Sequence, residues 1–226
     1  VAKEVELADS AIEAARTAAA GTGTDADGKT IYDTTAMSEA TTTLENAIAD
    51  GEASRARYDA LQARIDYAET VYGWWEGTSR KTTSLNNLNA AIISAKSKVT
   101  DYSLTNTQLT SNVTILNQRI AAVDKKIYCS TNACGTEEQL NVSTNQWCYA
   151  RSMQSKHWIL FWEAGYGTSV PAAVPSILEN ADKIFELYAD SLKYITINQG
   201  SSKTDTYKMI IRLRYTTEWE ASGSGI

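Results

Sequence analysis

The side chains best able to do chemistry are few and scattered along this chain of 226 residues. His157 is the single histidine, and an imidazole can act as a general base or bind zinc. No cysteine or carboxylate stands at ligand spacing from it, and the sequence contains no HExxH, P-loop or Gly-x-Ser-x-Gly motif. We therefore expect His157 to pack or to form a hydrogen bond, and we expect no catalytic residue, no metal site and no cofactor within these residues.

Carboxylates in the second half of the chain are the candidates for an acid and base pair in hydrolysis. No two of them are fixed in register by an obvious element, so solvated or ion-paired roles are expected instead. The residues concerned are Glu163, Glu179, Glu186, Glu218 and Glu220.

Three cysteines, Cys129, Cys134 and Cys148, lie close together in the sequence. The C-x4-C spacing without a second pair or a nearby histidine does not favour zinc. In an oxidising compartment Cys129 and Cys134, or either of them with Cys148, are expected to be close enough for a disulfide, and buried free thiols are the alternative.

Aromatic side chains are the candidate ligand-binding residues. A planar ring exposed to solvent can stack on a sugar, and four residues are candidates for such a platform: Trp74, Trp75, Tyr166 and Trp219. For Trp74 and Trp75 the alternative is that they close the end of a helical bundle or fill a domain junction.

Composition restricts the class of partner. The formal net charge is −6, without a cluster of Lys or Arg, so the surface offers no basic face for nucleic acid or for an anionic membrane. No apolar run is long enough to span a bilayer. The start, Val1-Ala2-Lys3-Glu4, is neither an initiator methionine nor a signal peptide, so we expect a trimmed start and membrane attachment only through a removed N-terminal lipid anchor.

The first half of the chain is predicted to be helical. Apolar spacings of three and four predict a bundle of about five helices over residues 1–128, with Gly21, Gly51 and Gly73 as helix ends. The expected helices are 3–20, 35–50, 53–72, 84–99 and 105–127. In the first helix the predicted buried stripe is Val5, Ala8, Ile12, Ala15 and Ala19, and in the last one Thr105 and Gln108 form a capping box.

The second half changes pattern. Residues 129–145 are read as a linker, and residues 146–226 as a partial α/β domain. Trp158–Trp162 is apolar on both faces, as an interior strand would be. A helix is expected from Pro175 to Tyr194, with its buried side formed by Ile177, Ala181, Ile184, Phe185, Tyr188 and Leu192. Residues 207–215 alternate as a second strand, with Lys208 on the polar side.

The segments L-x-x-A-I within residues 1–128 resemble the small three-helix modules that recur in bacterial cell-surface and secreted proteins. The segments WCYARSMQSKHWILFWEAGYG, ILENADKIFELYADSLKYI and YKMIIRLRYTTEWEASGSGI resemble the opening of a domain of unknown function in secreted lipoproteins of gut Bacteroidetes. They are also similar to the first strand, helix and strand of zincin-like metallopeptidases. The first resemblance implies a spacer, and the second implies an active site that lies beyond residue 226.

The leading hypothesis is therefore an exported, non-catalytic spacer or display region at the cell surface or in the periplasm. The alternatives are a module that binds a cell-surface glycan or protein through exposed aromatic rings, and the N-terminal part of a metallopeptidase-like hydrolase. Two strands and one helix cannot bury their own surfaces, so we also expect the chain to stop inside a domain. The alternatives are that the helical bundle packs back on the sheet, or that a partner chain, such as a second copy, adds strands at the open sheet edge.

Overall fold

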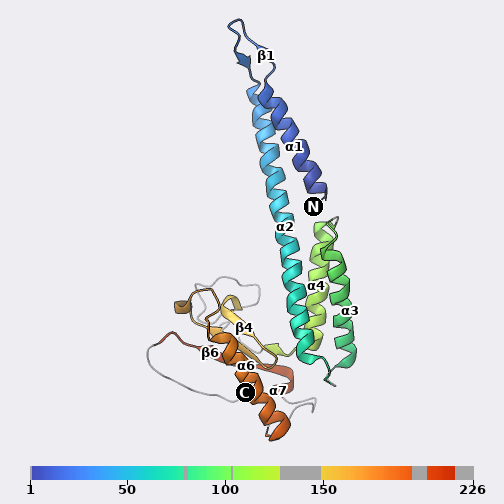
Figure 1. Cartoon of the computed structure of the whole chain (residues 1–226), viewed down its shortest axis with the longest axis vertical. Helices are drawn as coiled ribbons and strands as arrows, with labels where there is room; N and C mark the ends of the chain where they lie inside the picture. The colour runs from blue at the N-terminus through green and yellow to red at the C-terminus, as the bar shows by residue number, and fades with distance from the viewer. Residues whose placement is uncertain (1, 79–80, 103, 128–148, 195–202, 217–226) are drawn as a thin grey trace. The chain divides into compact units, whose positions relative to one another are not determined.

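A computed structural model describes residues 2–78, 81–102, 104–127, 149–194 and 203–216 of the chain (Figure 1). It divides into two compact units. The helical unit comprises residues 1–73 and 83–120, and the sheet unit comprises residues 74–82 and 121–226. The predicted class, a helical bundle followed by a small α/β domain, is confirmed.

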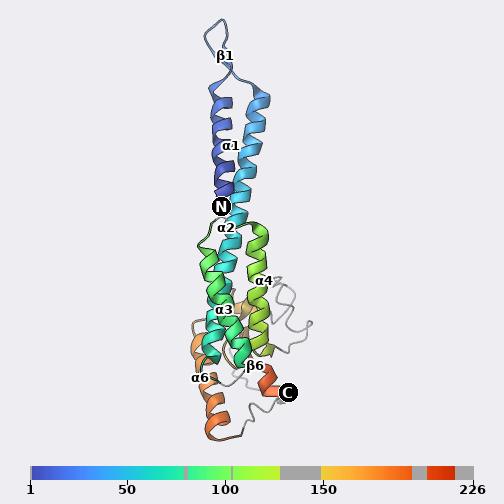
Figure 2. The same ribbon diagram turned by 90° about the vertical axis from the view of Figure 1, so that its right-hand side faces the viewer.

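The helical unit consists of one long helix with shorter helices beside it. Its elements are α1 (Ala2–Ala20), α2 (Thr34–Trp75), α3 (Thr82–Val99) and α4 (Asn106–Val123). Figures 1 and 2 show α1 beside the first part of α2, and α3 and α4 beside the later part. The two short strands β1 (Gly23–Thr24) and β2 (Thr30–Ile31) pair antiparallel in the turn between α1 and α2.

The prediction of two helices separated at Gly51 was wrong, because α2 runs unbroken for 42 residues. A glycine within a helix costs only about 1 kcal/mol relative to alanine. Here a continuous packing seam passes through Gly51, and the contacts along that seam offset the cost. The seam has spacings of four and three throughout, as in a coiled coil: Ala40, Leu44, Ala47, Gly51, Ser54, Tyr58, Leu61, Ile65, Ala68 and Tyr72. The described residues between 2 and 123 therefore form four helices rather than the expected five.

The seam between α1 and the first part of α2 is made of small residues. Ala11, Ala40 and Ala47 are buried, whereas Val5 and Ile12 of the predicted stripe are 52% and 39% exposed. Small side chains let two helices approach closely, so the contact lies on the alanine face and leaves the larger apolar residues beside it. The predicted stripe of the first helix was thus wrong at its two largest members.

Gly51→Ala should stabilise the helical unit. A Cβ at this position would meet no atom within 4 Å, and alanine restricts the unfolded chain more than glycine does, so a gain of roughly 0.5–1 kcal/mol is expected. Thermal unfolding followed by far-UV circular dichroism measures it.

The matched control is Gly21→Ala, since Gly21 has φ +78° and a Cβ there would lie 2.7 Å from the carbonyl oxygen of Ile31. This variant should lose stability. If both substitutions changed stability in the same direction, the helical conformation assigned to Gly51 would be wrong.

The hairpin of α3 and α4 follows the sequence closely. Leu85, Leu88, Ile92, Leu109 and Leu116 are buried as predicted. The capping box is confirmed, with the Thr105 N–H 2.8 Å from Gln108 Oε1 and the Gln108 N–H 3.3 Å from Thr105 Oγ1. Ile127 was expected to extend this helix, but α4 ends at Val123, and Lys126–Ile127 forms the strand β3.

The sheet unit holds a four-stranded mixed sheet in the order β3-β6-β5-β4. Strand β5 (Trp158–Trp162) lies between β6 (Tyr207–Leu213), which is parallel to it, and β4 (Ser152–Gln154), which is antiparallel. Strand β3 is parallel to β6 on its other side. The expected interior strand is therefore confirmed, whereas β3 and β4 were not anticipated. The edge strand β4 has only three residues, and short edge strands are one way in which sheets avoid pairing with other chains.

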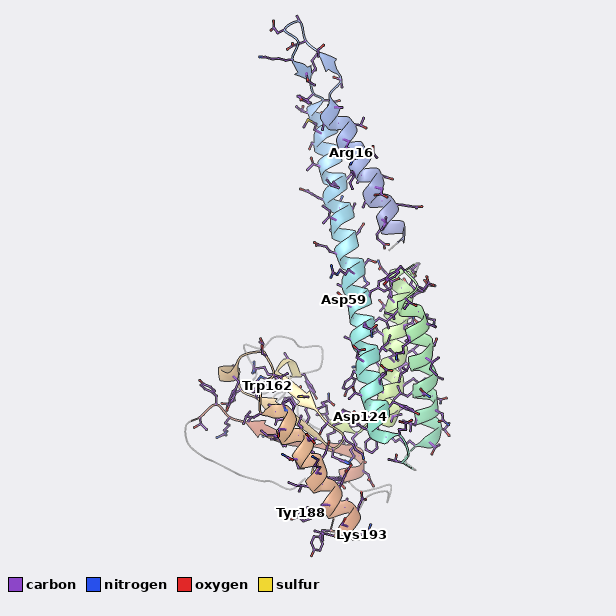
Figure 3. The ribbon with its side chains drawn as sticks, viewed as in Figure 1. Arg16, Asp59, Asp124, Trp162, Tyr188 and Lys193 are labelled. Carbon is purple, nitrogen blue, oxygen red and sulfur yellow. The ribbon has the colours of Figure 1, made fainter. Side chains whose placement is uncertain are left out.

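Helix α6 (Val174–Glu186) covers one face of this sheet and continues as the π-helical turn η3 (Leu187–Ser191). Leu160, Trp162, Val174 and Leu178 form the core between them. Part of the predicted buried side was wrong, because the small sheet needs only a narrow stripe of the helix. Ile184, Tyr188 and Leu192 are 54%, 41% and 46% exposed, and Figure 3 shows Tyr188 at the end of this helix, beside Lys193.

The short segments of the sheet unit are η1 (Tyr149–Arg151), η2 (Ala164–Tyr166) and α7 (Lys203–Thr206). The predicted linker, residues 129–145, lies outside the described residues.

Candidate functional site

Three parallel strands begin at one edge of the sheet, and this amino edge gathers charged side chains. Lys125 immediately precedes β3, His157 immediately precedes β5, and Lys208 is the second residue of β6. All three are buried. The parallel register of β3, β6 and β5 brings these sequence-distant residues together.

Lys208 is completely buried and is held by two oxygen atoms. Its Nζ lies 2.9 Å from Asp124 Oδ2 and donates to the carbonyl oxygen of Ser155 at 2.8 Å. The ammonium group also lies 4.3 Å from the ring centroid of Trp74, a cation–π contact. Burial lowers the pKa of Lys208 below its ordinary value, and the carboxylate of Asp124 opposes that shift. The alternation predicted that Lys208 shares a strand face with Arg212 and Arg214, but it did not indicate that Lys208 is buried.

His157 is packed between aromatic rings and bonded to a lysine. Lys125 Nζ lies 2.7 Å from His157 Nδ1, which makes Nδ1 the acceptor and places the proton of a neutral ring on Nε2. The ring stacks on Phe185 at 4.0 Å between centroids and meets Trp75 edge-on at 5.8 Å. This is the packing and hydrogen-bonding role that the sequence favours for the single histidine.

Helix α6 brings carboxylates to the same edge. Asp182 accepts the backbone N–H groups of His157 at 3.0 Å and Lys156 at 3.1 Å, and Glu186 accepts from Lys156 Nζ at 2.7 Å. Burial raises the pKa of Asp182, and its hydrogen bonds, including the one from the N–H of His157, oppose the shift. Every charge of this amino-edge cluster thus faces an opposite charge, a hydrogen-bond partner or an aromatic ring.

The chemistry of the amino-edge cluster is that of a structural network. Its lysines donate to oxygen or nitrogen atoms of the protein, and its histidine is 5% exposed. Perturbed pKa values mark functional sites when they occur in a cleft, but buried ion pairs also produce them. Here the charges join β3, β5, β6 and α6 to the aromatic pair Trp74 and Trp75.

The opposite, carboxyl edge of the sheet carries the exposed aromatic rings. After β5, Glu163 accepts the backbone N–H of Tyr215 at 2.8 Å, and the Tyr166 hydroxyl donates to the carbonyl oxygen of Arg214 at 3.1 Å. The rings of Tyr166 and Tyr215 meet edge to face at 5.0 Å. Tyr215 is 63% exposed and Tyr166 36%, so this tyrosine pair is both oriented and accessible.

Buried groups fix the turn beneath the tyrosine pair. Trp162, labelled in Figure 3, donates from Nε1 to the carbonyl oxygen of Gly167 at 3.0 Å. The buried Arg151 donates from Nε to the Trp162 carbonyl oxygen at 3.0 Å. Tyr215 covers Gly165 so closely that a Cβ there would lie 2.5 Å from the tyrosine ring. Ligands of parallel sheets bind characteristically at the carboxyl ends of the strands.

The structure separates the four aromatic candidates. Trp75 is 4% exposed and lies in the amino-edge cluster, and Trp74 is half-buried under Lys208. Of the three candidates that the structure describes, Tyr166 alone lies at the carboxyl edge. Trp219 is outside the described residues, as are the disulfide candidates Cys129, Cys134 and Cys148.

Sequence reasoning missed the partner of Tyr166 and the buried lysines. The sequence pattern assigned Tyr215 to one face of the second strand. Its position directly after Arg212 and Arg214, at the end of that strand, was a usable signal of exposure. Lys125 and Asp124 follow a long apolar helix seam, and nothing local marks them as buried, because their burial depends on strand pairing. Glu163, expected to be solvated or paired, holds the backbone of Tyr215.

Within the described ranges, no three His, Cys, Asp or Glu side chains are grouped so that they could hold a metal ion. The helices in those ranges also include none with the length and apolarity needed to cross a membrane.

Residues 119–226 match a family of unknown function, DUF6055. The match spans the sheet unit from the end of α4 onward. Searches among curated proteins and among solved structures found no match to the chain.

Proposed function

We propose that the chain is a non-catalytic spacer and display protein of the bacterial cell surface or periplasm, in which the helical unit presents the sheet unit. The observation that carries the proposal is the unbroken helix α2. Its 42 residues extend about 63 Å at 1.5 Å per residue, far longer than an average helix of a globular domain. The resemblances to cell-surface helical modules and to secreted lipoproteins of Bacteroidetes support the location.

A spacer depends on its length and stiffness rather than on the identity of its surface residues. Removing one heptad from α1 together with the facing heptad of α2 keeps the alanine seam in register, and the sheet unit should remain folded and displayed. Antibody labelling and protease treatment of intact cells that make the protein measure the display. If external protease cleaved the protein no more than it cleaved cytosolic markers, display at the surface would be refuted.

A second candidate function, saccharide binding, is supported by the tyrosine pair at the carboxyl edge. An oriented aromatic ring offers a sugar a flat apolar face at little entropic cost. Glu163, whose Oε2 accepts the Tyr215 N–H, places a carboxylate beside this ring. The amino-edge tryptophans are the weaker candidates, because Trp75 is enclosed.

Tyr215→Ala should abolish binding to any saccharide that the parent protein retains on a glycan array. Gly165→Ala should weaken the same binding roughly tenfold, because the new methyl group displaces the Tyr215 ring without removing it. Isothermal titration with the retained saccharide measures both. The control is Tyr194→Ala, which removes a 77% exposed tyrosine elsewhere in the sheet unit. Equal losses for the Tyr194 and Tyr215 variants would exclude a site at the carboxyl edge.

A further inference from the structure

The helical unit contains an open groove that neither proposed function uses. It has a volume of about 680 Å³ and lies where the first residues of α1, the middle of α2 and the turn after α3 meet. Its apolar lining includes Val5, Ala8, Ile48 and Tyr102. Val5, Ile48 and Tyr102 are 52%, 54% and 61% exposed, so the groove presents an apolar surface to its surroundings.

The groove is firmly built on one side. Tyr58 is buried in its lining and donates from its hydroxyl to the carbonyl oxygen of Asp101 at 2.8 Å. Its ring also contacts Tyr102 at 5.7 Å between centroids. The turn that follows α3 is therefore fixed to α2, and the groove does not depend on a loose loop.

One polar atom in the lining lacks a partner. Ser54 is 2% exposed, and its Oγ forms no hydrogen bond with any described residue. A buried hydroxyl without a hydrogen bond is destabilising, and such groups are rare in native proteins. Because this oxygen is itself closed to solvent, the exposed apolar and charged groups of the groove decide what it can bind.

The two parts of α2 differ in how completely they are packed. Farther along α2, the seam residues Leu61, Ile65 and Ala68 are completely buried in the part where α3 and α4 lie beside the helix (Figure 2). Among the described elements of the helical unit, α1 alone lies beside the first part of α2. Ile12 is also exposed and adds to the apolar side formed by Val5 and Ile48. An added amphipathic helix would supply the packing that the later part already has.

The charge of the surrounding surface selects among such helices. Residues 1–59 contain twelve Asp and Glu against five Lys and Arg, a net charge of −7, whereas the whole chain carries −6. Three acidic residues and one basic residue stand at the groove itself, and the basic residue, Arg55, lies 3.9 Å from Asp59; the acidic residues are Glu4, Glu52 and Asp59. A second copy of this acidic hairpin would be repelled, and a basic helix would be attracted.

We propose that this groove binds a basic amphipathic helix of a partner protein, with its apolar side against Val5 and Ile48 and its basic residues facing Glu4, Glu52 and Asp59. The partner would thereby complete a three-helix arrangement beside the first part of α2. This role goes beyond spacing, because it depends on particular side chains rather than on helix length.

The test uses the full chain and a synthetic peptide. The probe is a fluorescent amphipathic helix of about five turns made of leucine and lysine, with two control peptides. One has the same composition in scrambled order, and the other has glutamate in place of lysine. Fluorescence anisotropy should show binding of the leucine–lysine helix only, and binding should weaken as salt rises.

Matched variants locate the binding. Ile48→Glu should weaken peptide binding at least roughly tenfold. The control is Ile93→Glu, which should leave binding unchanged, because Ile93 of α3 is 62% exposed and lies outside the groove. Glu52→Lys should weaken it at low salt without affecting the helix content seen by circular dichroism. Equal binding to the Ile48 and Ile93 variants, or equal binding of the scrambled peptide, overturns the proposal. A dimer in sedimentation equilibrium that Ile48→Glu abolishes also overturns it, in favour of a second copy.

Discussion

Asp124→Ala should destabilise the sheet unit by about 3–5 kcal/mol at neutral pH, because it leaves the ammonium group of a completely buried lysine without its carboxylate. The remaining contacts of Lys208, with the Ser155 carbonyl oxygen and the Trp74 ring, carry no full negative charge. They therefore cannot replace the ion pair.

The loss should depend on pH in a direction that the lysine determines. Burial already lowers the pKa of Lys208 in the folded protein, and removing Asp124 removes a group that raises it. The unfolded state then binds more protons than the folded state between the lowered pKa and the ordinary lysine value of about 10.4, so stability rises with pH across that window. The Asp124 variant should thus be rescued in part at alkaline pH, and more strongly than the parent protein.

The measurement can isolate the sheet unit. All six tryptophans lie in residues 74–82 and 121–226, so tryptophan fluorescence during urea unfolding reports on that unit. Adding Lys208→Met to Asp124→Ala should recover most of the stability, since no buried charge then remains. The control is Glu179→Ala, which breaks an exposed ion pair with Lys183 in the same sheet unit and should change the stability little. An Asp124 variant as mild as the Glu179 variant would mean that water reaches Lys208.

Local patterns predicted the elements of this fold better than their ends. The apolar spacing of α3 and α4 and the capping box at Thr105 depend on neighbours within one or two turns, so the sequence alone predicts them. Gly51 misled the prediction because glycine is a helix terminator by local propensity. The uninterrupted seam from Ala40 to Tyr72 was the competing signal, and tertiary packing decided in its favour.

The candidate sites were harder to predict because they are assembled by strand pairing. Lys208 follows a polar alternation in the sequence, yet it lies at an edge where Asp124 is placed by a different strand. The contact of Tyr215 with Tyr166 likewise joins residues 49 positions apart across the β5 and β6 ends. Alternation assigns a residue to a face of a strand, but only the register between strands shows which charges or rings share an edge.

Phe185→Ala should be the other severe substitution, with an expected cost of about 3–5 kcal/mol in the sheet unit. Phe185 is 2% exposed, stacks on His157, and has Lys125 Nζ 4.7 Å from its ring centroid. Its removal creates a cavity and also takes away the aromatic surface that covers the pair of Lys125 and His157. Phe185→Leu should cost less, because it retains most of the buried volume.

A second readout distinguishes loss of this cover from loss of volume alone. Since His157 is the only histidine, its imidazole nitrogen signals in NMR spectra need no assignment. In the parent protein they should show one fixed tautomer, with the proton on Nε2, because Lys125 donates to Nδ1. In the Phe185→Ala protein, water admitted to the cavity should make the two tautomers exchange. Tyr188→Ala, one turn farther along and 41% exposed, is the control and should leave both the stability and the His157 signals nearly unchanged. If Phe185→Ala lost stability while His157 kept its single tautomer, the lysine hydrogen bond alone would orient the imidazole, and the aromatic stacking would contribute only volume.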